Sequence, residues 1–175
     1  MRRIFLALSV LSSLAFSGGI PVTLERSSDV TQVIASSRHE VLMLVPNLRS
    51  RVVANALRQA VVEGGVSLKI LCDASLVNER SSFIPMLSML HERKHDVRVR
   101  VLRRVNRTLL VVDQARAVFG PLVSELDSFG LNPTRLVTDA LEAQVQARAF
   151  RAQWQRATPW TYTLKSPSFK TGGQK

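Results

Sequence analysis

Apolar residues along the chain follow two periodicities, one typical of buried strands and the other of amphipathic helices. The runs Val41–Val45 and Leu109–Val112 contain no polar residue, which predicts strands buried on both faces of a sheet. Val66–Cys72 predicts another strand. Residues 50–63 predict a helix between two of these strands, because their apolar side chains recur at helical spacing: Val53, Ala56, Leu57, Ala60 and Val61. Strand, helix and strand in succession indicate a right-handed crossover between parallel strands.

The stretch 97–121 predicts a β-meander. Its first strand alternates apolar and basic residues, so that one face would be apolar and the other basic: Val97, Arg98, Val99, Arg100 and Val101. A basic turn follows, with Arg103, Arg104, Asn106 and Arg107. Leu109–Val112 then ends in Asp113. We expect the Asp113 carboxylate and the arginines of the turn to meet at the end of this strand, where α/β proteins usually hold their sites.

Further segments complete the predicted fold. A helix starts at Ser28, and residues 81–94 predict another. Residues 135–138 predict a short strand, and residues 139–156 predict a long helix whose apolar face holds Leu141, Val145, Ala149 and Ala152. Together the elements predict an α/β fold with a mixed, mostly parallel sheet flanked by helices.

At 175 residues the chain has the size of one domain that can bury a core. We divide it into a signal peptide, a linker or edge strand, the folded domain and a basic C-terminal arm: residues 1–17, 18–27, 28–157 and 158–175. The signal peptide joins Arg2 and Arg3 to an apolar core and ends in small residues at the spacing of a cleavage site. If it is not cleaved, residues 4–16 would anchor the protein in a membrane. Either way, we expect the domain outside the cytoplasm, in the periplasm or secreted.

Composition adds a strong positive charge. Lys and Arg number 24 against 13 Asp and Glu, which gives a formal net charge of +11 and a pI near 11.3. This excess favours a polyanionic partner such as nucleic acid, anionic lipid or acidic glycan, although a basic solvated surface is the alternative. The arginines of the predicted meander are the candidate phosphate ligands: Arg98, Arg100, Arg103, Arg104 and Arg107. No aromatic side chains that would stack bases are interleaved with them.

Residues able to bind metals are few. Cys72 is the only cysteine, so neither an intrachain disulfide nor a cysteine-based metal site can form. His91 and His95 are four apart on the predicted helix 81–94, a spacing that can hold a metal, but no third ligand has a natural position. We therefore expect no metal and no cofactor.

The stretch around Asp113 resembles the phospholipase D superfamily, whose motif is H-x-K-x4-D on such a strand, followed by a short hairpin and G-S-x-N. Asp113 and Gly120 match this motif. The preceding strand-helix-strand run also resembles the family: Ala60, Gly65, Val66, Leu68, Ile70, Leu71 and Asp73. The departures are Asn106 for His, Thr108 for Lys, Pro121 for Ser and Val123 for Asn. The resemblance covers residues 28–156 and implies one phospholipase D-like half.

In this family a His attacks phosphorus, a second His protonates the leaving group, and a Lys beside each neutralises the phosphoryl oxygens. Asn106 is not a usable nucleophile, because its amide lone pair is delocalised, and Thr108 carries no positive charge. No catalytic residue is therefore intact, and we expect a catalytically degenerate domain. Family members with two motifs build the site between two halves, so a single half implies a homodimer with the Asn106 loops facing each other.

Three functions stay open at this point. The first is an exported, degenerate domain that binds polyanions, with nucleic acid foremost, through its arginine-rich strand and turn. The second is an active phosphodiesterase or nuclease with a rearranged site. The third is a structural envelope or partner-binding domain.

Overall fold

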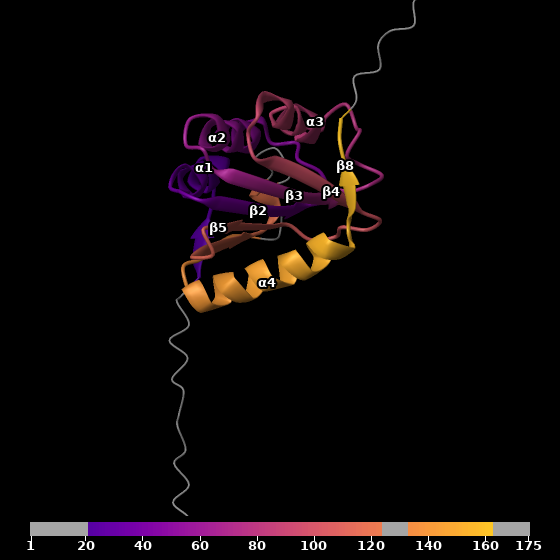
Figure 1. Cartoon of the computed structure of the whole chain (residues 1–175). Helices are drawn as coiled ribbons and strands as arrows, with labels where there is room; N and C mark the ends of the chain where they lie inside the picture. The colour runs from indigo at the N-terminus through magenta and orange to yellow at the C-terminus, as the bar shows by residue number, and fades with distance from the viewer. Residues whose placement is uncertain (1–20, 124–132, 163–175) are drawn as a thin grey trace, which may run out of the picture.

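The computed structural model describes residues 21–123 and 133–162 (Figure 1). Within these ranges the chain alternates strands and helices and includes two short 3-10 helices, η1 and η2. The elements in chain order are β1 (Val22–Leu24), α1 (Ser27–Ala35), β2 (Glu40–Val45), α2 (Arg51–Val62), β3 (Ser67–Asp73), α3 (Ile84–Ser88), η1 (His91–Arg93), β4 (Val97–Leu102), β5 (Leu109–Val112), β6 (Arg116–Phe119), η2 (Pro121–Val123), β7 (Thr134–Val137), α4 (Ala140–Arg156) and β8 (Thr158–Trp160).

The strands of the described ranges form one sheet in the order β1-β7-β6-β5-β2-β3-β4-β8. β2, β3 and β4 run parallel, with Met43 opposite Ile70 and Ile70 opposite Val99. Each remaining pair of neighbours is antiparallel. The α/β class is confirmed, but the expectation of a mostly parallel sheet is wrong. Parallel strands need long crossovers, whereas β5 and β6 are joined by a turn too short to make one.

The stretch 97–121 is not a meander. β4 and β5 are consecutive in the chain, but β3 and β2 lie between them in the sheet. β5 pairs antiparallel with β2, with Leu109 opposite Leu44, so residues 103–108 must cross the carboxyl ends of β3 and β2. The predicted alternation within β4 is confirmed, because Val97 and Val99 are buried and Arg98 is exposed. Alternation determines the two faces of a strand but does not select its neighbour.

Two apolar layers enclose the sheet. Figure 1 shows α1, α2 and α3 over one face and α4 across the other. Val41, Met43 and Val45 belong to the core beneath the first layer, whereas Leu42 and Leu44 belong to the core beneath α4. β2 therefore sends alternate side chains into two cores, which explains why its sequence contains no polar interruption.

The long helix α4 forms where predicted, but a different face is buried. Its buried residues are Ala143, Ala147 and Phe150, whereas Leu141 is 55% exposed and Val145 is 47% exposed. Small alanine side chains let the helix backbone approach the sheet, and Phe150 supplies the bulk of the contact. Close packing of the alanine face against the sheet therefore decides which face of α4 is buried, even though Leu141 and Val145 are larger and more hydrophobic.

The helix predicted over residues 81–94 is shorter in the structure. α3 ends at Ser88, and η1 is followed by Lys94 with a φ of 67°. A left-handed residue ends a helix, so His91 and His95 do not share one helical face. The two histidines are therefore not one turn apart on a helix, as the predicted metal pair requires.

The two ends of the described chain lie at opposite edges of the sheet. β1 belongs to the segment expected as a linker or edge strand, and it pairs with β7. β8 belongs to the segment expected as a basic arm, and it pairs with β4. The predicted signal peptide, residues 1–17, lies outside the described ranges. None of the helices described is long and apolar enough to cross a membrane.

Asp113 ties the β5–β6 hairpin to the start of β2. Asp113 and Gln114 have φ values of 50° and 55°, a left-handed conformation that Asp tolerates better than most residues. The Asp113 carboxylate accepts hydrogen bonds from the backbone N–H groups of Arg38 at 2.8 Å and of His39 and Glu40 at 2.9 Å. Partial burial would raise the pKa of Asp113, but these hydrogen bonds outweigh it and lower the pKa.

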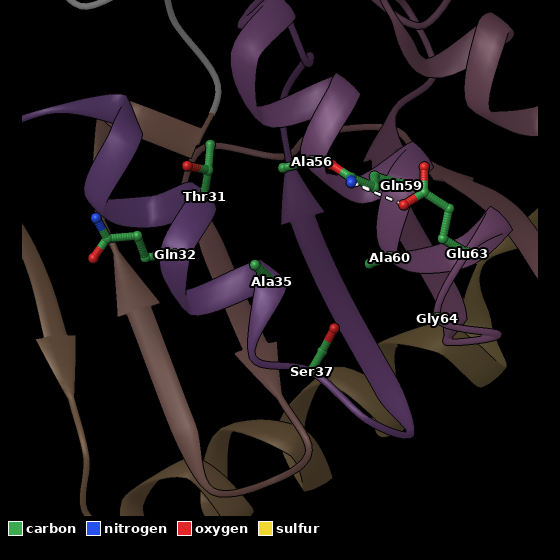
Figure 2. A pocket seen from close by; sticks show the side chains of 9 residues that line it. All are labelled: Thr31, Gln32, Ala35, Ser37, Ala56, Gln59, Ala60, Glu63 and Gly64. Carbon is green, nitrogen blue, oxygen red and sulfur yellow. Dashed lines mark hydrogen bonds between the residues drawn. The ribbon is translucent and has the colours of Figure 1, made fainter.

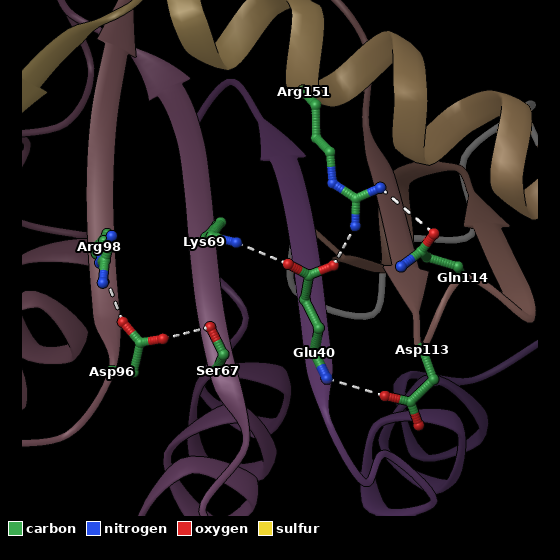
Figure 3. A network of polar contacts seen from close by, with 8 residues as sticks. All are labelled: Glu40, Ser67, Lys69, Asp96, Arg98, Asp113, Gln114 and Arg151. Atoms are coloured by element: carbon green, nitrogen blue, oxygen red, sulfur yellow. Dashed lines mark hydrogen bonds and ion pairs between the residues drawn. The ribbon is translucent and has the colours of Figure 1, made fainter.

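Glu40 extends this attachment to α4, as Figure 3 shows. Its carboxylate lies 2.7 Å from both Lys69 Nζ and Arg151 Nη2. Arg151 Nη1 also donates to Gln114 Oε1 at 3.3 Å. The Glu40 side chain is only 17% exposed, so these ion pairs are better shielded from solvent than ordinary surface pairs. The network joins β2, β3, the hairpin and α4 at the amino edge of the sheet.

We predict that Asp113→Ala lowers the free energy of unfolding by about 2 kcal/mol, because three backbone N–H groups lose their acceptor. Asp113→Asn should cost less, since it keeps one oxygen acceptor and tolerates a positive φ. A carboxylate with a lowered pKa stabilises the fold only while it is ionised. The stability gap between wild type and Asp113→Asn should therefore be full at pH 7 and shrink as the pH falls below the ordinary pKa of 3.8. Urea denaturation at pH 7 and pH 3 measures the gap, and a constant gap would contradict the assignment.

Candidate functional site

Residues 103–108, called the crossing loop below, carry the basic turn across the carboxyl edge of the sheet. Asp73, the last residue of β3, holds this loop in place. Its Oδ2 accepts a hydrogen bond from the backbone N–H of Val105 at 3.0 Å. Its Oδ1 accepts hydrogen bonds from Ser75 Oγ at 2.6 Å and from the backbone N–H of Ser75 at 2.9 Å. The Val105 side chain is buried beneath the loop. The backbone of the crossing loop is thus anchored by a hydrogen bond and by packing.

The electrostatics of Asp73 suit an anchor. Burial would raise its pKa, but the hydrogen bonds from Ser75 Oγ, from the Val105 N–H and from the Ser75 N–H outweigh that effect and lower the pKa. Asp73 is therefore ionised at neutral pH. Its carboxylate binds Ser75 and the backbone N–H of Val105, and none of the described hydrogen bonds that it accepts comes from an arginine.

Three of the predicted phosphate ligands project from the crossing loop. Arg103, Arg104 and Arg107 are all exposed. In the part of the chain that the structure describes, their guanidinium groups form no hydrogen bond or ion pair. Each offers five N–H donors in a planar fork, the geometry that binds phosphate oxygens in pairs. The loop therefore presents three unneutralised cations at one edge of the sheet.

The other two predicted ligands lie on the α4 face of β4. Arg98 Nε donates to Asp96 Oδ1 at 3.0 Å. Arg100 Nη1 donates to the backbone oxygen of Trp154 at 2.7 Å, and its guanidinium lies 5.0 Å from the centroid of the Trp154 ring. The five arginines thus fall into two groups, one exposed and unpaired, the other already in contact with α4 or Asp96.

The positions that the resemblance assigns to catalysis also lie at the carboxyl edge. Asn106 is exposed on the crossing loop, and Thr108 is partly buried just before β5. Gly120 follows β6 at the same edge, since Phe119 pairs with Leu109. Its φ is 127°, and a Cβ there would lie 2.6 Å from the Thr134 Cα, so only glycine fits. The backbone frame of the motif is present, whereas its nucleophile and cation positions hold an amide and a hydroxyl.

Asp113 does not join this group. It follows the last residue of β5, whereas the crossing loop precedes the first, and a strand of four residues is about 13 Å long. The expectation that Asp113 meets the arginines of the turn is therefore wrong. The carboxylate that contacts the loop is Asp73. Its signals in the sequence were its place at the end of a strand and its match to the strand-helix-strand run of the family, and neither indicated a contact with the loop.

A second polar cluster at the carboxyl edge was missed by sequence reasoning. Asn47 follows β2 and is buried; its Nδ2 donates to Glu79 Oε2 at 3.0 Å. Arg49 Nη2 donates to the same oxygen at 2.6 Å, and this hydrogen bond lowers the pKa of Glu79. Asn47 Oδ1 has no hydrogen-bond partner among the atoms described. Because Glu79 pairs with Arg49, the Arg49 guanidinium is less available to a phosphate than those of the crossing loop.

A cavity of about 450 Å³ lies between α1 and α2, as Figure 2 shows. Small or uncharged residues make most of its wall, including Ala35, Ala56 and Ala60. Its one charged residue is Glu63, which accepts a hydrogen bond from Gln59. A cavity without a cation does not suit a polyanion, so we do not assign the charged ligand to it.

The described residues also contain no cluster of three or more His, Cys, Asp or Glu that could hold a metal. Cys72 is buried, and burial together with the neighbouring charge of Asp73 raises its pKa to about 12. A thiol with such a pKa is neither a nucleophile nor a ready metal ligand at neutral pH.

Comparisons with protein-family models and with curated proteins find no match. Solved structures do match. NucT from Helicobacter pylori is 17% identical with a TM-score of 0.65, covering 81% of this chain and 98% of its own. Nuc from Salmonella typhimurium, a phospholipase D family member, is 15% identical with a TM-score of 0.66, covering 82% of this chain and all of its own.

A further match is TrmBL2, an archaeal chromatin protein with a novel mode of DNA binding. It is 16% identical with a TM-score of 0.58, and the match covers 86% of this chain and 57% of that one. Phosphatidylserine synthase from Haemophilus influenzae is 14% identical, with a TM-score of 0.52. At these identities the likeness concerns the fold. The chain therefore has the phospholipase D fold that its sequence resembles.

Proposed function

We propose that this protein is a catalytically degenerate phospholipase D-fold domain that binds nucleic acid outside the cytoplasm. The observation that carries the proposal is the crossing loop. Arg103, Arg104 and Arg107 are exposed and unpaired within the described ranges, and Asp73 fixes the backbone that bears them. The three arginines lie within five residues of a fixed backbone, so the loop is suited to a row of phosphates.

The absence of a nucleophile supports binding without cleavage. Attack on phosphorus needs an available lone pair, and the amide nitrogen of Asn106 shares its own with the carbonyl. Thr108 supplies no charge to the phosphoryl oxygens. Rate enhancements in enzymes are typically at least about 10⁶-fold, and losing both groups should remove most of that.

Charge and the structural neighbours favour nucleic acid among the polyanions. The net charge of +11 suits any polyanion, but TrmBL2, which shares this fold, is described as a chromatin protein with a novel mode of DNA binding. Closely spaced arginines on one loop match a ligand with regularly repeated phosphates. A free sugar acid or a dispersed lipid would not need such a row.

We predict retention of a labelled DNA oligonucleotide without cleavage, in EDTA and in magnesium. Affinity should fall steeply with salt, because each neutralised phosphate releases counterions. Replacing Arg103, Arg104 and Arg107 together with Ala should flatten the slope of log affinity against log salt by about 2 to 3. Gel retention across a salt series measures the slope, and denaturing electrophoresis of the same samples detects cleavage.

A matched control variant distinguishes the contribution of the crossing loop to binding from the contribution of overall charge. Arg38, Arg58 and Arg148 are also exposed and lie away from the crossing loop, so their triple Ala variant loses the same charge elsewhere. It should retain most of the binding and most of the salt slope. An equal loss in both triples would show that only net charge matters. Turnover by wild type would instead support the active phosphodiesterase with a rearranged site, and neither turnover nor retention would leave the structural role.

We also propose a homodimer in which the Asn106 loops face each other. The described chain has one half of the arrangement that the resemblance implies, and a twofold mate would place two crossing loops side by side. We predict a dimer by sedimentation velocity at micromolar concentration. A clean monomer at high micromolar concentration would refute it.

Export is the last part of the proposal. Arg2, Arg3 and the apolar core that follows have the order of a signal peptide, with small residues before Gly18. We predict that the mature protein begins at Gly18 or within a few residues of it. N-terminal sequencing of protein from the envelope fraction determines the first residue of the mature protein. Recovery of the full-length chain from the cytoplasm would rule it out.

A further inference from the structure

Among the described residues, the pairing of β8 leaves part of the β4 edge without a neighbouring strand. β8 pairs with Val99–Val101 and not with the start of β4 at Val97 and Arg98. Figure 1 shows β8 at this end of the sheet, beside β4. A cavity of about 250 Å³ lies along the open stretch, and residues of β4, β8, α4 and η1 line it. Its volume is below the range typical of drug-sized ligands, so it suits a single ring system.

Aromatic side chains reach this cavity from two elements distant from β4 in sequence. Trp160 lies opposite Val99, so the two side chains lie on the same face of the sheet, beneath α3. Trp160 packs against the core on that face and also lines the cavity. The Tyr162 ring lies 6.3 Å from the Trp160 ring at a tilt of 43°. Trp154 lines the cavity from α4. The sequence showed no aromatic residues interleaved with the arginines, and the fold brings them together.

Arg98 and Arg100 line the same cavity from the α4 face of β4, whereas Trp160 lines it from the other face, so the cavity extends around the edge of the strand. Both arginines are held in place. Arg100 is fixed by the Trp154 ring and by the hydrogen bond to its backbone oxygen, and Arg98 is fixed by Asp96. Each guanidinium uses one of its five N–H donors in these contacts, so the others remain for an anionic ligand. His91 lines the cavity as well and is exposed. The cavity thus combines an aromatic wall with two pre-positioned cations.

We propose that this cavity binds a base of a single-stranded nucleic acid, which stacks on Trp160 while the adjoining phosphates contact Arg98 and Arg100. This inference rests on the proposed function, since the strand would continue along β4 to the crossing loop, where Arg103 follows Leu102. Aromatic platforms beside a basic groove are how proteins hold single strands without reading sequence. In a duplex the bases are stacked on one another and their faces are not accessible, so the pocket selects single strands.

The test uses the full chain and three probes of equal length: oligothymidylate, an abasic oligonucleotide with the same phosphates, and a DNA duplex. We expect oligothymidylate to bind about ten-fold more tightly than the abasic strand, because a base stacked on an aromatic side chain is worth roughly a factor of ten in affinity. The chain has two tryptophans, so Trp154→Phe leaves Trp160 as the only indole reporter. Its fluorescence should be quenched by oligothymidylate and not by the abasic strand.

Two substitutions at Trp160 separate stacking from packing. Trp160→Leu keeps an apolar side chain against the core but removes the ring, and it should lower affinity for oligothymidylate about ten-fold without changing affinity for the abasic strand. Trp160→Phe keeps a ring and should restore most of the affinity. If Trp160→Leu fails to fold, the quenching experiment and Trp160→Phe still decide the question.

The outcomes distinguish this inference from the function on which it rests. Equal binding of oligothymidylate and the abasic strand, with the salt slope still dependent on Arg103, Arg104 and Arg107, would overturn the base pocket and leave the phosphate-binding loop. Equal or tighter binding of the duplex would also overturn the pocket. Failure of all three probes to bind would overturn both proposals.

Discussion

The pairing of β5 with β2 determines where the candidate phosphate ligands of this protein lie. Because β5 does not pair with the strand before it, the chain must cross the carboxyl ends of β3 and β2 after leaving β4. This crossing carries Arg103, Arg104 and Arg107 over the edge of the sheet. The same pairing leaves the outer edge of β4 free for β8, which brings Trp160 to Arg98 and Arg100.

The carboxylates of Asp73 and Asp113 lie at opposite edges of the sheet, and both accept hydrogen bonds from backbone N–H groups. Asp73 accepts the N–H of Val105 at the carboxyl edge, and Asp113 accepts three successive N–H groups before and at the start of β2 at the amino edge. Hydrogen bonds to an ionised acceptor are stronger than neutral ones, so each anchor resists loop opening. Each carboxylate has a structural role, because the hydrogen bonds that it accepts fix the neighbouring backbone.

The α4 layer links stability to the basic surface. Alanines bring the helix close to the sheet. The Phe150 ring stacks on the Trp154 ring with 5.8 Å between the ring centroids, and the Trp154 ring contacts the guanidinium of Arg100. Arg151 from the same helix shares Glu40 with Lys69. A protein with many more bases than acids must keep its cations apart or paired. Here Lys69, Arg100 and Arg151 are paired or held on the α4 face, whereas Arg103, Arg104 and Arg107 of the crossing loop have no ion-pair partner among the described residues.

The sequence by itself determined most of the local elements and the two faces of the buried strands, because the periodicity of apolar residues follows burial. It did not determine the buried face of α4, where Ala143 and Ala147 face the sheet in place of Leu141 and Val145. Val41–Val45 and Leu109–Val112 were recognisable as strands buried on both faces, and the motif around Asp113 and Gly120 indicated the phospholipase D fold. Only the tertiary structure decided which strands are neighbours, since strand alternation is the same whatever the partner. It separated Asp113 from the arginines, assigned the loop anchor to Asp73, and joined Trp160 to β4. Those contacts link residues far apart in the chain, and no local pattern encodes them.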